Sequence, residues 1–554
     1  MQDNRWRKVL PLVAGAAALA LTLGGCAPGG SSTDAGERPI RMWSGHMTPI
    51  TNNFNPFASE TATHMTFGAI YEPLFFFNQL SDEAPVGLIG DSFEYSEDGK
   101  TLTITIKPDL KWSDGKDLTS KDVAFTLGYA NNLDKDMVGV ETPDDTTVVV
   151  TYSSPKFTAA SLILGGMWIV PEHIWADITD YATETNPKPV GSGPYTLKSF
   201  TDAAYTLEAN KEFREKVAIK EVQDIGIDSN QSSEDLLKTG KLDWVGQFIA
   251  NPDNVTSSGR NATINQQQDP TVIMTCSNAE LGCKGAQTDP AVRQAINVAI
   301  DREAIGSKAF AGLSGISTPS FVLPGRDDKW LSDPSLLESP QTPDAAAAGA
   351  ILEAAGYTKG SDGFYGKDGV AIELDLFSPD GWTDYNDAAK LISAQAADAG
   401  IRINARTVSD AEYWTPISSG DYEMALYGLT QSLVADPFAT YDTYFATEAT
   451  AKVGEDPTAG QNYGRYSNSV VDQAVITAGA TQDEAVKKEA YAAAQAEIAK
   501  DLPYIPVVLN ASQSFFNTKD FTGWPTEDDL YASPLPYLST ASAVILTHLR
   551  PTEK

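Results

Sequence analysis

The sequence predicts an α/β protein that is divided into two or three lobes. At 554 residues, the chain is too long to enclose a single hydrophobic core. Its 42% hydrophobic and 21% charged residues are ordinary proportions for a soluble globular protein. Between residues 372 and 408, an alternating strand, a helix that ends at Gly400 and a second strand follow one another. This spacing is typical of a parallel strand–helix–strand unit, so we expect parallel strands in at least one lobe.

Residues 1–26 predict a lipoprotein signal peptide. A basic N-terminal region precedes an apolar run. This run is too short, and too rich in alanine and glycine, for a membrane span. Cys26 follows Leu-Gly-Gly, which resembles the lipobox of bacterial lipoproteins, where a diacylglycerol is attached to the thiol. Two acyl chains suffice for stable anchoring, and residues 27–38 predict a flexible Gly/Ser-rich tether. The alternative is an ordinary secreted protein with an incidental cysteine.

The charge of the chain excludes some partners. It contains 40 Lys and Arg residues against 74 Asp and Glu residues, which gives a formal net charge of −34. Nucleic acids and anionic membrane surfaces reward basic patches, so neither is expected as a partner. The charge predicts a soluble monomer, but it does not identify a ligand.

The two cysteines beyond the signal peptide are Cys276 and Cys283. In an exported protein such a pair is expected to form a disulfide. No histidine lies close to them, and the four histidines of the chain form neither an HExxH motif nor a paired spacing. We therefore expect no metal site and no cofactor.

No catalytic motif is visible in the sequence. It contains neither a Gly-x-Ser-x-Gly nucleophile elbow nor a Cys/His pair. The Gly191–Gly193 loop lacks the Lys-Ser/Thr of a P-loop and the spacing of a dinucleotide-binding motif, so we interpret it as structural. The prediction is a binding protein and not an enzyme. Because 74 acidic residues make carboxylate pairs unavoidable, a secreted hydrolase is the alternative from another class.

Local patterns predict the elements of the N-terminal half in order. A strand is expected at residues 40–43, and a helix between Asn55-Pro56 and Glu72-Pro73. Leu102, Ile104 and Ile106 alternate with threonines, which predicts a half-buried strand. Thr119, with Asp122 three residues later, approximates a capping box and predicts the start of a helix. Further strands are expected at 146–152 and from Pro194 onward.

The C-terminal half begins with two capped helices. Asp289 is a good N-cap because its carboxylate can accept from the first free N–H groups, and Pro290 suits the first helical position. An apolar stripe follows at helical spacing, formed by Val292, Ala295, Ile296 and Ala299. Asp301 predicts the cap of the next helix. Later helices are expected at 345–357, 386–400 and from Ala485, and strands at 372–378, 401–408 and 502–510.

Several of these strings resemble the oligopeptide- and dipeptide-type solute-binding proteins of bacterial ABC importers, known as family 5. The string DPAVRQAINVAIDREAI at 289–305 resembles the first helix of the larger lobe in that family. The string DGKTLTITIKPDLKWSDGKDLTSKDVAF at 98–125 resembles its most recognisable motif. The YEPL, VGSGPY and GDY strings at 71–74, 190–195 and 420–422 match it as well. The resemblance covers essentially the whole mature chain.

The resemblance implies a two-lobed α/β fold of the class II periplasmic-binding-protein type. An extra small α/β domain would be inserted in the first lobe, and the ligand cleft would lie between the lobes. The implied boundaries are 39–52, 187–275 and 511–554 for lobe I, 53–186 for the inserted domain and 276–510 for lobe II.

The resemblance also implies a function. The chain would be an extracytoplasmic lipoprotein on the outer face of the cell membrane that captures a small molecule by lobe closure. It would deliver this ligand to the transmembrane permease subunits of an ABC importer, while a separate ATPase supplies the energy. An adhesin or signalling receptor on the same fold is an alternative.

The class of ligand depends on one loop. In peptide-binding members of the family, an aspartate about four residues before an Asp-Pro or Glu-Pro pairs with the α-amino group of the ligand. Here Leu433 lies four residues before Pro437, so this aspartate is missing unless a small gap brings Asp436 into its place. A buried ammonium group without a partner would be costly, which counts against a peptide.

A sugar ligand requires flat aromatic rings for its apolar faces, and amides and carboxylates for its hydroxyl groups. The candidates in or beside the predicted cleft loops are Trp43, Trp382, Trp414, Tyr427, Gln431, Asp436 and Trp524. The string GWPTEDDLYASP at 523–534 resembles the oligosaccharide-binding branch of the family. The alternative for each tryptophan is core packing. As a group, these residues slightly favour an oligosaccharide over an oligopeptide.

Overall fold

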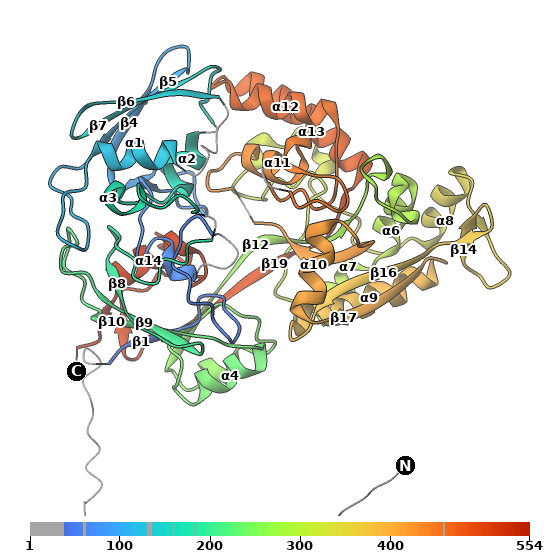
Figure 1. The fold of residues 1–554 in the computed structure, drawn as a ribbon. Helices are drawn as coiled ribbons and strands as arrows, with labels where there is room; N and C mark the ends of the chain where they lie inside the picture. The colour runs from blue at the N-terminus through green and yellow to red at the C-terminus, as the bar shows by residue number, and fades with distance from the viewer. Residues whose placement is uncertain are drawn as a thin grey trace, which may run out of the picture. The chain divides into compact units, whose positions relative to one another are not determined.

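The computed structural model describes residues 38–58, 63–129, 136–158, 160–181, 183–430, 432–457 and 460–553. The predicted signal peptide with Cys26, nearly all of the predicted tether and the candidate Gln431 lie outside the described residues. The described chain combines helices with five sheets, which confirms the predicted α/β class (Figure 1).

A ten-stranded sheet of mixed direction organises the chain. Its two longest strands, β12 (Asn261–Thr275) and β19 (Tyr504–Asn517), pair antiparallel over almost their whole length and run side by side in Figure 1. In spatial order the strands are β17 (Arg402–Val408), β16 (Glu373–Pro379), β18 (Met424–Gly428), β12, β19, β11 (Trp244–Val245), β1 (Ile40–Met42), β10 (Glu221–Ile225), β9 (Ala204–Ala209) and β8 (Tyr195–Phe200).

Strands β12 and β19 connect two sets of hydrophobic cores. Ile264 and Phe516 belong to a core that also contains Ile40 of β1. Farther along the same two strands, Ile273 and Ile505 belong to another core, with the helices that follow β12. We use "first lobe" for the cores built from residues 40–264 and 515–549, and "second lobe" for those built from residues 272–508. The chain therefore passes between the lobes on two adjacent strands.

The first lobe carries a second sheet with its own core. Its strands lie in the order β4 (Gly90–Tyr95), β5 (Thr101–Ile106), β7 (Thr147–Tyr152) and β6 (Met137–Asp144). The leucine and the two isoleucines of β5 point into this core and its threonines lie on the half-buried face, as predicted. Other parts of the segment 53–186, such as Phe54 and Trp175, lie in the core of β1 instead. The exact boundaries of an inserted domain remain a prediction.

The remaining elements of the first lobe are short. They are β2 (Phe75–Phe76), β3 (Val86–Gly87), α1 (Ser120–Gly128), α2 (Ala160–Gly166), α3 (Glu172–Trp175), α4 (Asn230–Lys238), α5 (Asp253–Thr256), β20 (Phe521–Thr522), α14 (Ser539–His548) and β21 (Arg550–Pro551). Helix α1 begins with the predicted capping box, in which Thr119 N–H donates to Asp122 at 2.9 Å.

The helix predicted between Asn55-Pro56 and Glu72-Pro73 is wrong. In the described part of this segment, the helical structure is a 3-10 turn at His64–Thr66, followed by a bridge between Phe67 and Tyr71. Side chains from Met65 to Tyr71 are buried in succession. An amphipathic helix would leave one face exposed, whereas this segment is enclosed on all sides.

The Gly191–Gly193 loop has the structural role that we predicted. A Cβ atom at Gly191 would lie 1.9 Å from the carbonyl oxygen of Ile70, and one at Gly193 would lie 2.3 Å from that of Ala69. Gly193 N–H and Tyr195 N–H donate to these two oxygens at 2.8 and 3.0 Å. The glycines therefore allow two backbone segments to come into direct contact.

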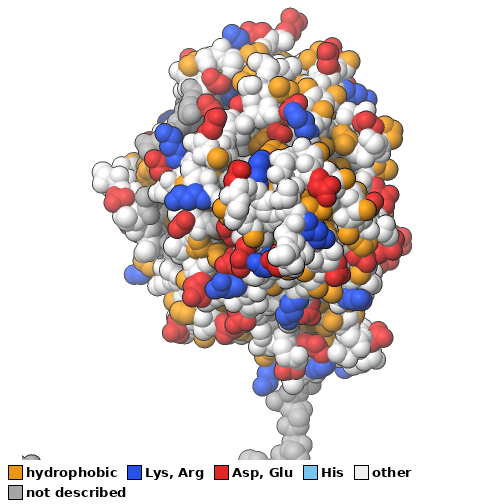
Figure 2. Space-filling model, turned by 90° about the vertical axis from the view of Figure 1, so that its right-hand side faces the viewer, with side chains coloured by type: hydrophobic (Ala, Val, Ile, Leu, Met, Phe, Trp, Pro, Cys, Tyr) orange, Lys and Arg blue, Asp and Glu red, His pale blue; other side chains and the backbone are white. Residues whose placement is uncertain are grey.

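The second lobe follows the predicted order closely. Helix α6 (Pro290–Ala299) is capped by Asp289, and α7 (Arg302–Lys308) by Asp301. Helix α9 (Thr383–Asp398) joins the parallel strands β16 and β17, which confirms the strand–helix–strand unit. The other elements are α8 (Ala345–Ala354), β13 (Thr358–Lys359), β14 (Tyr365–Lys367), β15 (Val370–Ala371), α10 (Asp410–Ser419), α11 (Phe438–Phe445), α12 (Ser469–Gly479) and α13 (Glu484–Asp501). On the face shown in Figure 2, acidic and basic side chains are interspersed.

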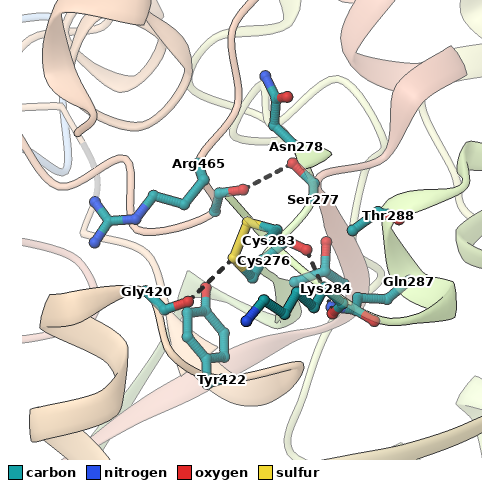
Figure 3. The surroundings of a disulfide bond; sticks show 12 residues. Cys276, Ser277, Asn278, Cys283, Lys284, Gln287, Thr288, Gly420, Tyr422 and Arg465 are labelled. Carbon is teal, nitrogen blue, oxygen red and sulfur yellow. Dashed lines mark hydrogen bonds between the residues drawn. A yellow bond between two sulfur atoms is a disulfide. The ribbon is translucent and has the colours of Figure 1, made fainter. Parts of the chain in front are cut away.

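Cys276 and Cys283 form a disulfide, with their Cα atoms 5.5 Å apart (Figure 3). Cys276 directly follows β12, and its Sγ lies 3.3 Å from the carbonyl oxygen of Gly420. Gln287 Nε2 donates to the carbonyl oxygens of Cys276 and Lys284 at 3.2 and 2.6 Å. The disulfide and Gln287 together fix the loop between β12 and α6.

Candidate ligand-binding site

A cavity of about 280 Å³ lies where segments of the two lobes meet. Ligand pockets in proteins usually start at a volume of about 300 Å³, so this cavity is at the small end of that range. The first lobe lines it with Phe75–Gln79, Gly165, Gly166, Trp168, Ser533 and Tyr537–Ala541, and the second lobe with Thr430 and Leu433.

The aromatic wall of the cavity is formed by the chain from Phe75 to Gln79. Its first two residues are β2, which pairs with β3 through Phe75 and Gly87. Asn78 Nδ2 then donates to the carbonyl oxygen of Leu530 at 2.7 Å, which links this wall to the C-terminal segment that supplies Tyr537. Two distant parts of the first lobe are therefore held together at the cavity.

Trp168 lies beside this wall. It forms an isolated bridge with Pro73, and its ring centroid lies 4.4 Å from that of Phe67. The nearby Gly165 allows close packing, because a Cβ atom there would lie 2.5 Å from the Phe77 ring and 3.5 Å from Leu433. The cavity therefore has closely packed aromatic walls.

The second-lobe side follows strand β18. Leu429 N–H donates to the carbonyl oxygen of Pro270 at 3.0 Å, and Thr430 N–H donates to Tyr444 Oη at 3.0 Å. Leu433 then reaches the cavity. The residue at the position where peptide-binding relatives are expected to carry an aspartate is thus an apolar side chain that lines the candidate site.

No charged side chain lines the cavity, as far as the described residues show. Two residues of its lining, Trp168 and Ser533, each carry a buried polar atom, Nε1 and Oγ, that has no hydrogen-bond partner within the described part of the chain. A buried donor without a partner costs free energy, so both atoms favour a ligand that brings hydrogen-bonding oxygen atoms.

Two carboxyl groups interact electrostatically with Tyr537 without lining the cavity. Burial raises the pKa of Asp269 to about 6, although a hydrogen bond from Ser512 opposes this, and burial also raises the pKa of Asp384 to about 6. Burial raises the pKa of Tyr537 well above its ordinary value, and the two carboxyl groups raise it further. Tyr537 therefore remains a neutral donor at every physiological pH.

The predicted tryptophans and Tyr427 lie outside this cavity. Trp43 is 9% exposed, and its ring centroid lies 6.2 Å from that of Tyr537, which does line the cavity. Trp382 and Trp414 are 40% and 38% exposed. Trp414 packs against Tyr427, with their ring centroids 6.0 Å apart. Among the predicted site residues that the structure describes, none lines the cavity.

Asp436 is engaged by the protein itself. It is 7% exposed, and it accepts hydrogen bonds from Lys487 Nζ and Phe438 N–H at 2.7 and 2.9 Å and another from Tyr491 Oη. Lys487 therefore neutralises the carboxylate of Asp436, and the hydrogen bonds that this carboxylate accepts come from the protein itself. This geometry does not favour Asp436 as the partner of a ligand ammonium group.

Trp524 is part of the first-lobe core. It is 7% exposed and stacks on Phe516 with ring centroids 4.9 Å apart. Its Nε1 donates to the carbonyl oxygen of Asn517 at 3.0 Å, so its polar atom is also satisfied internally. The alternative interpretation of core packing fits this position.

The aromatic residues that line the cavity were not among the predicted site residues; they are Phe75–Phe77, Trp168 and Tyr537. The run of three phenylalanines directly after the YEPL string was the available signal, because consecutive aromatic residues cannot all face one core from a two-residue strand. Trp168 and Tyr537 carry no such signal, since each stands in an ordinary apolar context.

Two lobes joined by paired strands, with a cavity between them, define a two-lobed periplasmic binding protein of class II. Residues 84–452, more than half of the chain, match the family described as "Bacterial extracellular solute-binding proteins, family 5 Middle". The chain belongs to this family of bacterial extracellular solute-binding proteins, which confirms the resemblance found in the sequence.

Individual relatives show the range of ligands. Protein XP55 of Streptomyces lividans is 28% identical over 441 residues, which cover 74% of this chain and 73% of its own. The glutathione-binding protein GsiB of Escherichia coli (strain K12) is 24% identical over 84% of this chain and 88% of its own. A periplasmic oligopeptide-binding protein of an ABC transporter from Thermotoga maritima, solved with mannohexaose bound, superposes with a TM-score of 0.84 at 24% identity, over 93% of this chain and 99% of its own.

These relatives support the coarse functional class. The similar proteins are solute-binding proteins rather than enzymes, and solute-binding proteins of ABC importers bind small molecules and deliver them to permeases. Within the described residues, no helix combines the length and apolar character that crossing a bilayer requires. The same residues contain no group of three or more His, Cys, Asp or Glu side chains that could hold a metal ion.

Proposed function

We propose that this chain is the extracytoplasmic substrate-binding lipoprotein of an ABC importer, and that its ligand is an uncharged oligosaccharide. The observation that carries the choice of ligand is the aromatic cavity between the lobes, whose described lining contains no charged side chain. The mannohexaose found in the Thermotoga maritima relative supports the same choice.

The physical argument is one of desolvation. A free peptide carries an ammonium and a carboxylate group, and each would lose its water on closure of the lobes. The lining offers neither group an opposite charge, and Lys487 already neutralises Asp436. A sugar ring instead presents an apolar face to rings such as Phe77 and Trp168, and it supplies oxygen atoms to Trp168 Nε1 and Ser533 Oγ. The cavity therefore suits a neutral, hydroxyl-rich ligand.

A thermal-shift comparison tests this proposal. The protein without residues 1–26 is heated with mannohexaose, other α- and β-linked oligosaccharides, glutathione or short free peptides. A ligand present at 100 times its dissociation constant stabilises the folded state by about 2.7 kcal/mol, which is readily measured. We expect a shift with at least one oligosaccharide. A shift with peptides or glutathione alone would establish the alternative, an oligopeptide-type ligand. The similarity to the glutathione-binding protein GsiB is the reason for testing it.

The membrane anchor is a separate part of the proposal. Cys26 lies in a lipobox-like sequence, so we expect it to carry a diacylglycerol and to tether a monomeric binding protein beside the permease at the outer face of the membrane. Mass spectrometry of the native protein is expected to find Cys26 as the modified N-terminal residue. An unmodified N-terminus beyond residue 26 would exclude the anchor.

A further inference from the structure

Arg326 connects both walls of the cavity. It belongs to the second lobe, on a segment fixed by Phe321 and Trp330 in the core of that lobe. Its Nη1 donates to the carbonyl oxygen of Gln79 at 2.6 Å and to that of Ser432 at 3.0 Å. Gln79 ends the aromatic wall of the first lobe, whereas Ser432 lies between the cavity residues of the second lobe.

Asp327 fixes the orientation of this guanidinium group. Arg326 Nε and Nη2 donate to the two carboxylate oxygens of Asp327, both at 2.7 Å. The two side chains are only 6% and 2% exposed. Asp327 is itself held in place, because its N–H donates to the carbonyl oxygen of Leu323 at 2.9 Å. A planar fork held in this way leaves Nη1 directed at its two carbonyl acceptors.

Other hydrogen bonds between the lobes are expected to be weaker than the one from Arg326 to Gln79. Thr158 Oγ1 donates to the carbonyl oxygen of Ala478 at 3.2 Å, and Asn230 Nδ2 to Thr383 Oγ1 at 3.3 Å. Both are longer than the bond from Arg326 to Gln79, and both join neutral groups. A charged donor makes a hydrogen bond about twice as strong as a neutral one does.

From this geometry we infer that Arg326 is a positioning residue that holds the two walls of the ligand cavity together and slows ligand release. The Arg326–Asp327 pair is carried by the second lobe, and its outward hydrogen bond to Gln79 forms only when the first-lobe wall is in place. Opening of the lobes would break this bond while the pair with Asp327 remains intact. The residue therefore stabilises the contact between the two walls in addition to pairing with Asp327 inside the second lobe.

The first test needs no ligand. Amide hydrogen exchange, read by mass spectrometry, is compared between the wild type and Arg326→Ala in peptides that contain Phe75–Gln79. We expect exchange there to become about tenfold faster, and to accelerate clearly more than exchange in β18, because opening of the wall is local. Arg326→Lys keeps the positive charge but loses the planar guanidinium group, so its exchange rate at Phe75–Gln79 should be intermediate. An intermediate rate would show that the effect of the alanine variant follows the lost hydrogen bonds and does not come from misfolding.

Arg406→Ala is the matched control. Arg406 is paired with Asp375 inside the second lobe, and its side chain is 56% exposed. This variant should exchange like the wild type at Phe75–Gln79. Unchanged exchange at Phe75–Gln79 in Arg326→Ala would overturn the inference, and so would an equal acceleration in β18, which would reveal a general loss of stability.

The consequence for ligand release rests on the proposed function. Dissociation of mannohexaose, followed by tryptophan fluorescence in stopped flow, is expected to be about tenfold faster in Arg326→Ala than in Arg406→Ala, whereas the association rate changes little. Equal dissociation rates would overturn the role in ligand release. If the wild type does not bind mannohexaose, the proposed ligand class fails for this sugar, while the exchange experiment still decides the role of Arg326.

Discussion

Replacing Asp243 with alanine is expected to lower the free energy of unfolding by about 3 to 5 kcal/mol, the usual cost of breaking a buried ion pair. The side chain of Asp243, the residue directly before β11, is fully buried. Its oxygens accept from Arg38 at 2.7 Å, Arg260 at 3.0 Å and Arg41 at 3.1 Å. Asn517, the last residue of β19, donates to the same carboxylate at 2.9 Å. Within the described residues, the alanine variant would remove the ion-pair partner of Arg41 and leave Arg38 and Arg260 with Asp520 alone.

Urea denaturation of both proteins measures the loss. Asp375→Ala is the matched control, because it removes a pair with Arg406 that lies at the surface, and exposed pairs contribute at most about 1 kcal/mol. A loss at Asp243 as small as the loss at Asp375 would contradict a structural role for this carboxylate.

The effect of Asp243 also depends on pH. Burial raises the pKa of Asp243, but the hydrogen bonds and charges of Arg38 and Arg41 outweigh burial, so the pKa lies below its ordinary value. A carboxyl group with a lowered pKa stabilises the fold above its unfolded pKa, near 3.9, and this contribution is lost as the pH falls through the folded value. The difference between the wild type and Asp243→Ala should therefore shrink below about pH 4.

Replacing Trp168 with alanine is expected to weaken the binding of mannohexaose by about 10- to 100-fold, within the range found for aromatic residues at the centre of a binding site. The substitution removes a ring that lines the cavity, as well as the buried Nε1 donor that has no partner within the described residues. Trp168→Phe keeps an aromatic face and loses only the donor, so it should weaken binding about tenfold. Isothermal titration calorimetry at one pH measures all three affinities.

Trp414→Ala provides the comparison for this series. Trp414 was a predicted site residue, but it lies outside the cavity beside Tyr427. Its removal should change the affinity by no more than about twofold, as for a peripheral contact. A larger loss at Trp414 than at Trp168 would show that the ligand occupies a different surface.

Local chemistry explains which parts of the fold were predictable. The caps of α1, α6 and α7 were read correctly, because a side-chain oxygen beside the first free N–H groups acts within a few residues. The unit formed by β16, α9 and β17 was found for the same reason, since its periodicities are local. The predicted helix before Glu72-Pro73 failed because long-range burial on all sides overrides local preference.

The candidate site was harder to predict, because a cavity is a long-range property. Trp524 was a candidate because of the string around it and Trp168 was not, yet Trp168 lines the cavity and Trp524 stacks on Phe516 in a core. Asp436 was a candidate from the sequence, but its ion pair with Lys487 could not be predicted because Lys487 lies on helix α13, far away along the chain. Leu433 is the exception, since the sequence alone indicated that an expected charge was missing from the loop that reaches the cavity.

Native mass spectrometry of the protein, purified without added ligand from the cells that produce it, tests the central claim most directly. A tightly held ligand is retained through purification, and its mass identifies its class. We expect the released molecule to be a neutral oligosaccharide, with a mass that fits whole sugar units. A bound peptide, or any ligand with a free ammonium group, would contradict the interpretation of the uncharged aromatic cavity.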